Sequence, residues 1–227
     1  MENNQSLTYK KNNSKKKSLE TIILFGLNYV GKTSLLLQLT KNRFEKKYLT
    51  TIGINYYLKE FENTNLSIWD TCGDEIEMEI LPLHIYKQSS CFIIVLSYNS
   101  IESLNSTNHF IEYIKNKIEK VKCKDKKTFI ALINKSDLKD KSFTLENAIH
   151  LLTENNPSIL VAEISSKNNL SVLEFFKKVC DLLHDKNNIN NNLNENLIKK
   201  RSNTIFYSGN FRINEESFVN EAHSKCC

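Results

Sequence analysis

The sequence lacks several features that would assign it to a simple class. Its 227 residues include only five glycines and two prolines, and the apolar stretch from Leu19 to Leu27 is far too short to span a bilayer. The first residues lack the apolar region of a secretory signal, and Glu2 stands where N-myristoylation requires glycine. These absences disfavour a secreted, membrane-spanning or myristoylated protein.

The cysteines and the charges disfavour two further classes. The six cysteines show no metal-ligand spacing, which disfavours a metal site built from them. The formal net charge is only +5, and the basic residues are not interleaved with aromatic ones as in many nucleic-acid-binding proteins. Basic residues cluster at 10–17 and 199–201. These clusters are either solvated tails or segments attracted to anionic lipid, at about 1 kcal/mol per basic residue.

Two of the five glycines fall in one short motif. Gly26 and Gly31 belong to Gly-Leu-Asn-Tyr-Val-Gly-Lys-Thr, which fits the phosphate-binding loop pattern. The apolar run Leu19–Phe25 before it predicts a buried strand, and the Leu-rich segment 33–40 after it predicts a helix. In this setting backbone N–H groups, the helix N-terminus and Lys32 face phosphates, and the following threonine can ligate Mg²⁺. The alternative interpretation is a glycine turn beside an unrelated lysine, but it does not explain why the motif lies between a predicted strand and a predicted helix.

A second motif indicates which base is bound. The apolar run 129–133 predicts another buried strand, and Asn134-Lys135-Ser136-Asp137 follows it directly. A carboxylate at Asp137 can accept hydrogen bonds from both N1–H and the exocyclic amine of guanine. Adenine lacks this donor pair and would leave the carboxylate unpaired, which opposes an adenine-specific ATPase. Lys135 can lie along the base plane, and Asn134 can tie this segment to the phosphate-binding loop.

Two further segments complete the set. Residues 66–68 predict a strand that leads to Asp70, which can hold Mg²⁺ through water, and to Gly73, whose N–H can meet a γ-phosphate. A strand from about Ile159 to Glu163 leads to three residues whose backbone N–H groups can reach the guanine oxygen: Ser165, Ser166 and Lys167.

The alternation of apolar strands with amphipathic helices predicts an α/β fold with a parallel sheet covered on both faces. Apolar residues recur at helical spacing in 100–121 and 170–183. The asparagine- and lysine-rich ends are expected to be disordered. We therefore expect three regions: a basic N-terminal extension over 1–18, one nucleotide-binding domain over 19–184, and a flexible tail over 185–227 that ends in Cys-Cys.

With these motifs in order, the segment Leu19–His184 resembles a small GTPase of the Ras superfamily. Thr51-Ile52-Gly53-Ile54-Asn55-Tyr56 and Ile68-Trp69-Asp70 are similar to Rab signatures, and Cys226-Cys227 is similar to the cysteine pair at the end of many Rab proteins. The resemblance implies a P-loop NTPase small G domain, with a mostly parallel six-stranded sheet and helices on both faces.

The resemblance also implies roles for individual residues. It implies Mg²⁺ ligation by Thr33, Thr51 and Asp70. It implies contribution to hydrolysis by Asp74, Lys32 and Thr51. The residues it implies in contact with GTP or GDP are Gly26, Asn28, Tyr29, Val30, Gly31, Lys32, Thr33, Ser34, Phe44, Tyr48, Thr51, Gly73, Asn134, Lys135, Asp137, Ser165, Ser166 and Lys167.

The sequence departs from the family pattern near the γ-phosphate. Asp74 stands where the family has its catalytic glutamine, and a carboxylate is acceptor-only and adds negative charge there. Asn28 stands at the loop position that is small in relatives that hydrolyse GTP fast, and Tyr29 is its neighbour. Two functions therefore stay open: a Rab-like switch that hydrolyses GTP slowly, and a GTP-bound interaction scaffold with negligible turnover.

The resemblance implies membrane trafficking and a set of partners. Lipidated Cys226 and Cys227 would hold the protein on the cytoplasmic face of intracellular membranes, with a cytosolic pool; otherwise the pair is two free thiols. Prenylation machinery, an exchange factor, a GTPase-activating protein and effectors are the implied partners. The expected effector surface includes Tyr56, Trp69 and His84, although Trp69 would also suit a half-buried strand position.

Overall fold

The structure is a computed structural model that describes residues 17–45, 50–74, 79–138, 140–188 and 206–207. The strands it describes are β1 (Ser18–Phe25), β2 (Ile54–Glu60), β3 (Thr64–Thr71), β4 (Ser89–Ser97), β5 (Thr128–Asn134) and β6 (Leu160–Glu163). The helices are α1 (Lys32–Lys41), α3 (Leu83–Gln88), α4 (Ile101–Asn105), α5 (Thr107–Lys120), α6 (Leu145–Asn155) and α7 (Asn169–Asn188).

The strands form one six-stranded sheet in the order β2-β3-β1-β4-β5-β6. Only β2 runs antiparallel to its neighbour, and the other four pairings are parallel. The predicted fold class, a mostly parallel six-stranded sheet with helices on both faces, is confirmed.

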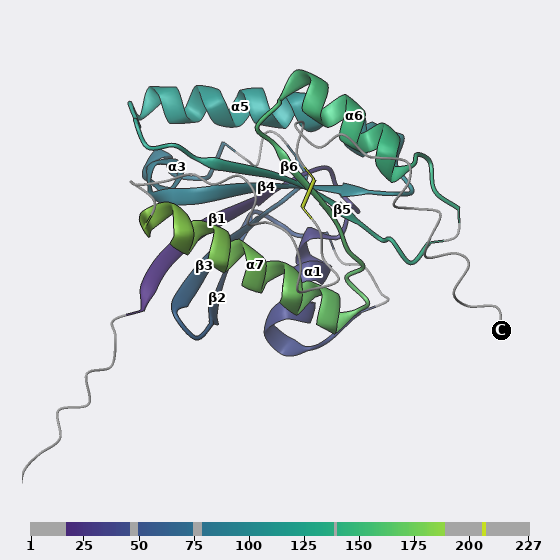
Figure 1. The fold of residues 1–227 in the computed structure, drawn as a ribbon, viewed down its shortest axis with the longest axis horizontal. Coiled ribbons are helices and arrows are strands. Elements are labelled where there is room, and N and C mark those ends of the chain that lie inside the picture. The colour runs from purple at the N-terminus through teal and green to yellow at the C-terminus, as the bar shows by residue number, and fades with distance from the viewer. Residues whose placement is uncertain (1–16, 46–49, 75–78, 139, 189–205, 208–227) are drawn as a thin grey trace, which may run out of the picture.

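The central strands are buried on both sides because helices cover both faces of the sheet (Figure 1). Phe110 and Ile114 of α5 pack on one face, together with residues of α3 and α6. Leu35 of α1 and Phe175 of α7 pack on the other. This sandwich explains the near-continuous apolar character of β1, β4 and β5. Among the described residues, no helix is both long and apolar enough to cross a membrane.

The helix expected over 100–121 is wrong as a single element. The structure has two helices there, α4 and α5, which meet at Ser106. The Ser106 and Thr107 hydroxyls both donate to the Ser103 carbonyl, at 3.1 and 3.2 Å. Such side-chain bonds compete with the helical backbone pattern, so a periodic apolar stripe does not reveal the break.

Part of the segment predicted as a flexible tail contacts the domain. Tyr207 pairs with Val161 on the edge of the sheet, through two backbone hydrogen bonds of 2.8 and 2.9 Å. The Phe206 ring lies 5.8 Å from that of Phe175 in α7. These two residues of the predicted tail therefore contact the folded domain. The rest of the tail beyond Asn188, and the N-terminal extension before Lys17, lie outside the described residues, so the proposed division of the chain stays a prediction.

Candidate functional site

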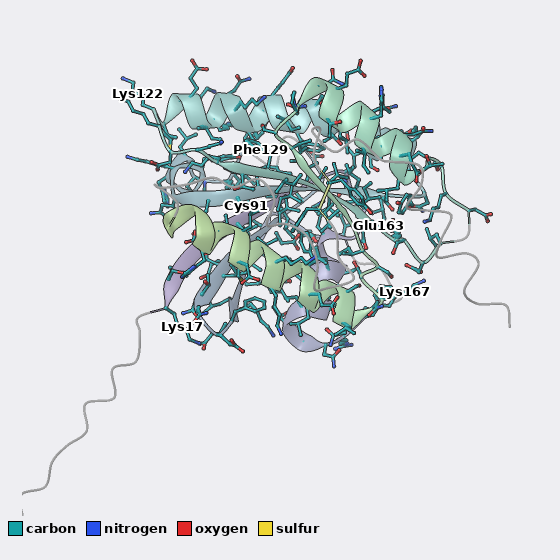
Figure 2. All side chains as sticks on the ribbon, viewed as in Figure 1. Lys17, Cys91, Lys122, Phe129, Glu163 and Lys167 are labelled. Carbon is teal, nitrogen blue, oxygen red and sulfur yellow. The ribbon has the colours of Figure 1, made fainter. Side chains whose placement is uncertain are left out.

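The candidate site lies at the carboxyl ends of the parallel strands, where open α/β sheets bind ligands. β1 leads into Gly26, β3 carries Asp70 near its end, and β5 ends at Asn134. Glu163 and Lys167 lie at this end of the sheet, from which α7 starts, whereas Lys17 lies at the opposite end (Figure 2). The topology thus gathers motifs that are far apart in the sequence.

The phosphate-binding loop is held in a backbone shape that its two glycines allow. Gly26 has φ 135°, and a Cβ there would lie 2.3 Å from the Val95 carbonyl oxygen. Gly31 has φ 99°, and a Cβ there would lie 2.4 Å from Asn134 Nδ2. Tyr29 also adopts a positive φ of 66°. Glycine is required at both positions by close packing as well as by backbone conformation.

Lys32 is the buried cation of the loop. It is 6% exposed, and its Nζ donates to the Gly26 carbonyl at 2.8 Å and to the Leu27 carbonyl at 3.0 Å. Burial lowers the pKa of Lys32 to about 8, against the opposing effect of Asp70. Because an ammonium group has three donors, one remains for a phosphate oxygen.

Three side chains whose oxygen atoms could ligate a hard cation such as Mg²⁺ meet beside Lys32. Thr33 Oγ1 lies 2.6 Å from Thr51 Oγ1 and donates to Asp70 Oδ2 at 2.7 Å. Asp70 is fully buried, and its Oδ1 has no hydrogen-bond partner among the described residues. Burial raises its pKa to about 6, although the Thr33 hydrogen bond and Lys32 act in the other direction. A buried, incompletely paired carboxylate beside two hydroxyls fits Mg²⁺, whose other ligands would be phosphate and water.

Asn134 links the base-binding segment to the phosphate-binding loop. Its Nδ2 donates to the Val30 carbonyl at 2.9 Å, and its Oδ1 accepts from the Ser166 N–H and hydroxyl at 3.0 and 2.9 Å. Lys135 adds a second link, because its Nζ donates to the Tyr29 carbonyl at 2.7 Å. Burial lowers the pKa of Lys135.

Replacing Asn134 by Ala is expected to lower the free energy of unfolding by about 2–4 kcal/mol. The change removes the donor to the Val30 carbonyl and the acceptor for the Ser166 N–H, leaving buried polar groups without these partners. Urea unfolding with an unchanged m-value measures the loss. Asn116→Ala, at an exposed position of α5, is the control and is expected to change stability by less than about 0.5 kcal/mol. A loss of stability for Asn134→Ala that is no larger than the loss for the control would contradict the linking role of Asn134.

Asp137 is the candidate base-recognising carboxylate. Its side chain is 28% exposed; Oδ1 accepts from Ser165 Oγ at 2.6 Å, and Oδ2 is paired with the Lys167 ammonium. Burial favours a higher pKa for Asp137, but the bonds from Lys167 and Ser165 outweigh it and lower the pKa. The Lys167 ammonium also lies 5.9 Å from the centre of the Phe44 ring. The groups expected around guanine are therefore brought together.

The remaining predicted residues divide into three groups. Asn28, Tyr29, Ser34 and Gly73 line a cavity of about 360 Å³ together with the Thr33 and Thr51 described above. Asp74 is exposed, and its carbonyl accepts from Cys72 Sγ at 3.5 Å. Tyr48, Cys226 and Cys227 lie outside the described residues.

The predicted effector surface is brought together in part. Tyr56 and Trp69 face each other across β2 and β3, with ring centroids 5.3 Å apart in an edge-to-face arrangement. Tyr56 is 53% exposed, so this aromatic pair is accessible. His84 is exposed on α3, outside the two-strand pair.

Sequence reasoning missed one residue at the site and one contact elsewhere in the domain. Asn99 follows the carboxyl end of β4, and its Oδ1 accepts from Lys135 Nζ at 3.3 Å and from Ser97 Oγ at 2.6 Å. The position after a buried parallel strand is a signal that could have found Asn99. Glu79 pairs with the buried Lys117 of α5, and no local sequence signal marks this contact.

Comparison with known proteins decides the family. The protein-family model described as "Ras family" matches residues 21–185 of this sequence. The chain belongs to the Ras family. Ras-related protein Rab-9A of Rattus norvegicus is 30% identical over 171 residues, which is 72% of this chain and 82% of that protein. Ras-related protein Rab-5B of Plasmodium falciparum is 29% identical over 170 residues, 73% and 78% of the two chains.

A third relative matches more closely over a shorter stretch. Ras-related protein Rab7 of Pisum sativum is 35% identical over 103 residues, 44% of this chain and 50% of that protein, so the match spans half the length of that relative. These similarities identify this Ras-family chain as Rab-like.

Proposed function

We propose that this Rab-like protein is a guanine-nucleotide switch that binds GTP and GDP with Mg²⁺ and hydrolyses GTP slowly. The observation that carries the proposal is that Asn134 and Lys135, which directly precede the segment of Asp137, bond to the phosphate-binding loop. A base held at Asp137 and phosphates held at Lys32 would be contacts of one ligand, and the links fix the spacing between them.

Guanine recognition would replace donors that already satisfy Asp137. The N1–H and the exocyclic amine of guanine would take over the two carboxylate oxygens that now accept from Ser165 and Lys167. The Lys167 ammonium would leave its position over Phe44, and the base would stack on that ring. ATP would bring no equivalent donor pair, so it would bind more weakly.

Hydrolysis would proceed by attack of water on the γ-phosphorus and cleavage of its bond to the oxygen that bridges to the β-phosphate. Lys32 would stabilise the negative charge on the phosphate oxygens, and the Gly73 N–H would donate to the γ-phosphate. Mg²⁺, held through Thr33, Thr51 and Asp70, would neutralise developing charge. Asp74 would offer the attacking water an acceptor but no donor, which accounts for the slow rate proposed here.

Replacing Asp74 by Gln is expected to raise single-turnover GTP hydrolysis by about tenfold or more over a wild-type rate no faster than about 10⁻⁴ s⁻¹. Glutamine can both accept from and donate to the water, and it removes a negative charge from its vicinity. Asp74→Asn is the matched variant that removes the charge and keeps the length. If Asp74→Gln lowers the rate, Asp74 itself positions the water and the slow-switch proposal is wrong on this point.

A GTP-bound scaffold with negligible turnover is the second candidate function. It is favoured by Asp74, which stands where the family has its catalytic glutamine, and by Asn28, which stands at a loop position that is small in relatives that hydrolyse GTP fast. The nucleotide content of the purified protein separates the two functions when it is followed by single-turnover hydrolysis. Retained GTP that stays intact supports the scaffold, whereas conversion to GDP supports the switch.

The proposed cellular role is vesicle and membrane trafficking, through nucleotide-dependent binding of regulators and effectors. The accessible pair of Tyr56 and Trp69 lies on the two strands that leave the nucleotide site, so it would sense the ligand state. His84 is proposed as a further contact. Lipid attached by the prenylation machinery at Cys226 and Cys227 would keep the protein on the cytoplasmic face of intracellular membranes, in exchange with a cytosolic pool.

A further inference from the structure

The segment after β3 rests directly on the phosphate-binding loop. The Gly73 N–H donates to Asn28 Oδ1 at 3.1 Å, across 45 residues of sequence. A Cβ at Gly73 would lie 2.1 Å from the Asn28 backbone nitrogen and 2.5 Å from the Leu27 carbonyl carbon. Any side chain at position 73 would therefore clash with the backbone of the phosphate-binding loop. Because glycine has no side chain, the Gly73 N–H can come within hydrogen-bonding distance of the Asn28 side chain.

The same segment is held from the other side. The Cys72 N–H donates to the Gly53 carbonyl at 3.2 Å. Gly53 lies two residues from Thr51, whose hydroxyl contacts Thr33. Asn28 thus contributes to a network that links both segments expected to respond to nucleotide.

We propose that the Asn28 carboxamide occupies the place of a terminal-phosphate oxygen on Gly73 and so shifts nucleotide preference from the triphosphate toward the diphosphate. The proposal rests on the proposed function, in which the Gly73 N–H donates to the γ-phosphate. One N–H makes one strong hydrogen bond, so a γ-phosphate oxygen must displace Asn28 Oδ1. A diphosphate leaves the Asn28–Gly73 bond intact.

The expected change in nucleotide preference is set by the loss of one hydrogen bond, because a γ-phosphate oxygen replaces Asn28 Oδ1 on the Gly73 N–H. A net hydrogen bond in a protein corresponds to about a fivefold change in an equilibrium. Asn28 Oδ1 is the acceptor, because the Gly73 N–H can only donate and only the oxygen of the carboxamide can accept.

The test compares Asn28→Leu and Asn28→Gly with the wild type, using the full chain in Mg²⁺. Leucine keeps the size of asparagine and removes its acceptor, and glycine removes both. The dissociation constants of GDP and of a non-hydrolysable GTP analogue are measured by competition. We expect the analogue-to-GDP ratio of these constants to fall about fivefold in both variants. Asn116→Leu, at an exposed position of α5, is the control and leaves the ratio unchanged.

Each other outcome has a distinct meaning. An unchanged ratio in both variants overturns the proposal, and a change in Asn28→Gly alone assigns the effect to bulk and also overturns it. A rise in the ratio shows that Asn28 binds the terminal phosphate directly, which is the opposite role. Failure of the wild-type protein to bind either nucleotide would instead contradict the proposed function.

Trp69 provides a second readout, since it is the sole tryptophan of the chain and lies on β3, which leads to Gly73. The difference in its fluorescence between the GDP and analogue complexes is expected to be larger in Asn28→Leu than in the wild type. The wild type holds Gly73 on Asn28 in the diphosphate state, whereas the variant leaves it without that contact.

Discussion

Replacing Asp137 by Asn is expected to lower the affinity for GTP by about 10²-fold or more and to create affinity for xanthosine triphosphate. The wild-type carboxylate can accept two charge-assisted hydrogen bonds from guanine, each corresponding to about 1.5–3 kcal/mol. Asparagine offers one acceptor and one donor, so it opposes the guanine amine. Xanthine carries a carbonyl oxygen at that position, which the asparagine amide can bind.

Competition binding of GTP, xanthosine triphosphate and ATP to the wild type and to Asp137→Asn measures this exchange. Asp181→Asn on α7 is the matched control, because it removes the same charge from an exposed position. It should leave all three affinities within about twofold. Equal wild-type affinity for ATP and GTP, or a variant that loses GTP without gaining xanthosine triphosphate, would show that Asp137 does not recognise the base.

The parts of the site that can be predicted from the sequence are those encoded locally. A strand, a glycine loop and a helix start occupy consecutive residues from Ser18 to Lys41, so their physics can be read without the rest of the chain. The parallel sheet then follows, because apolar strands alternate with helices and their carboxyl ends meet at one edge. Asn134 and Asp137 come together with the phosphate-binding loop for this reason.

The parts that could not be predicted depend on contacts between distant segments. Asn28 and Gly73 are 45 residues apart in the sequence. They come together because Asn28 follows β1, Gly73 follows β3, and these two strands pair in the sheet. The pairing of Tyr207 with Val161 likewise needs the exposed edge of β6, which no pattern around residue 207 reveals. The break at Ser106 could not be predicted for another reason. Hydroxyl groups there compete with the helical backbone hydrogen bonds, whereas apolar periodicity alone predicts one continuous helix.

Replacing both Cys226 and Cys227 by Ser is expected to move the protein from the membrane fraction to the soluble fraction. A single lipid chain gives only marginal attachment, whereas two give stable anchoring, so the cysteine pair is the proposed anchor.

Fractionation of cells that express the full chain, with mass analysis of the modified cysteines, measures the proposed anchoring. Cys123→Ser is the control, because Cys123 is a partly exposed thiol of the folded domain while Cys72, Cys91 and Cys180 are buried. It should leave the protein in the membrane fraction. Each single replacement at 226 or 227 should give partial release, because one remaining chain binds reversibly. Unchanged fractionation of the double variant would show that the membrane is reached by other means, and that Cys226 and Cys227 are ordinary thiols.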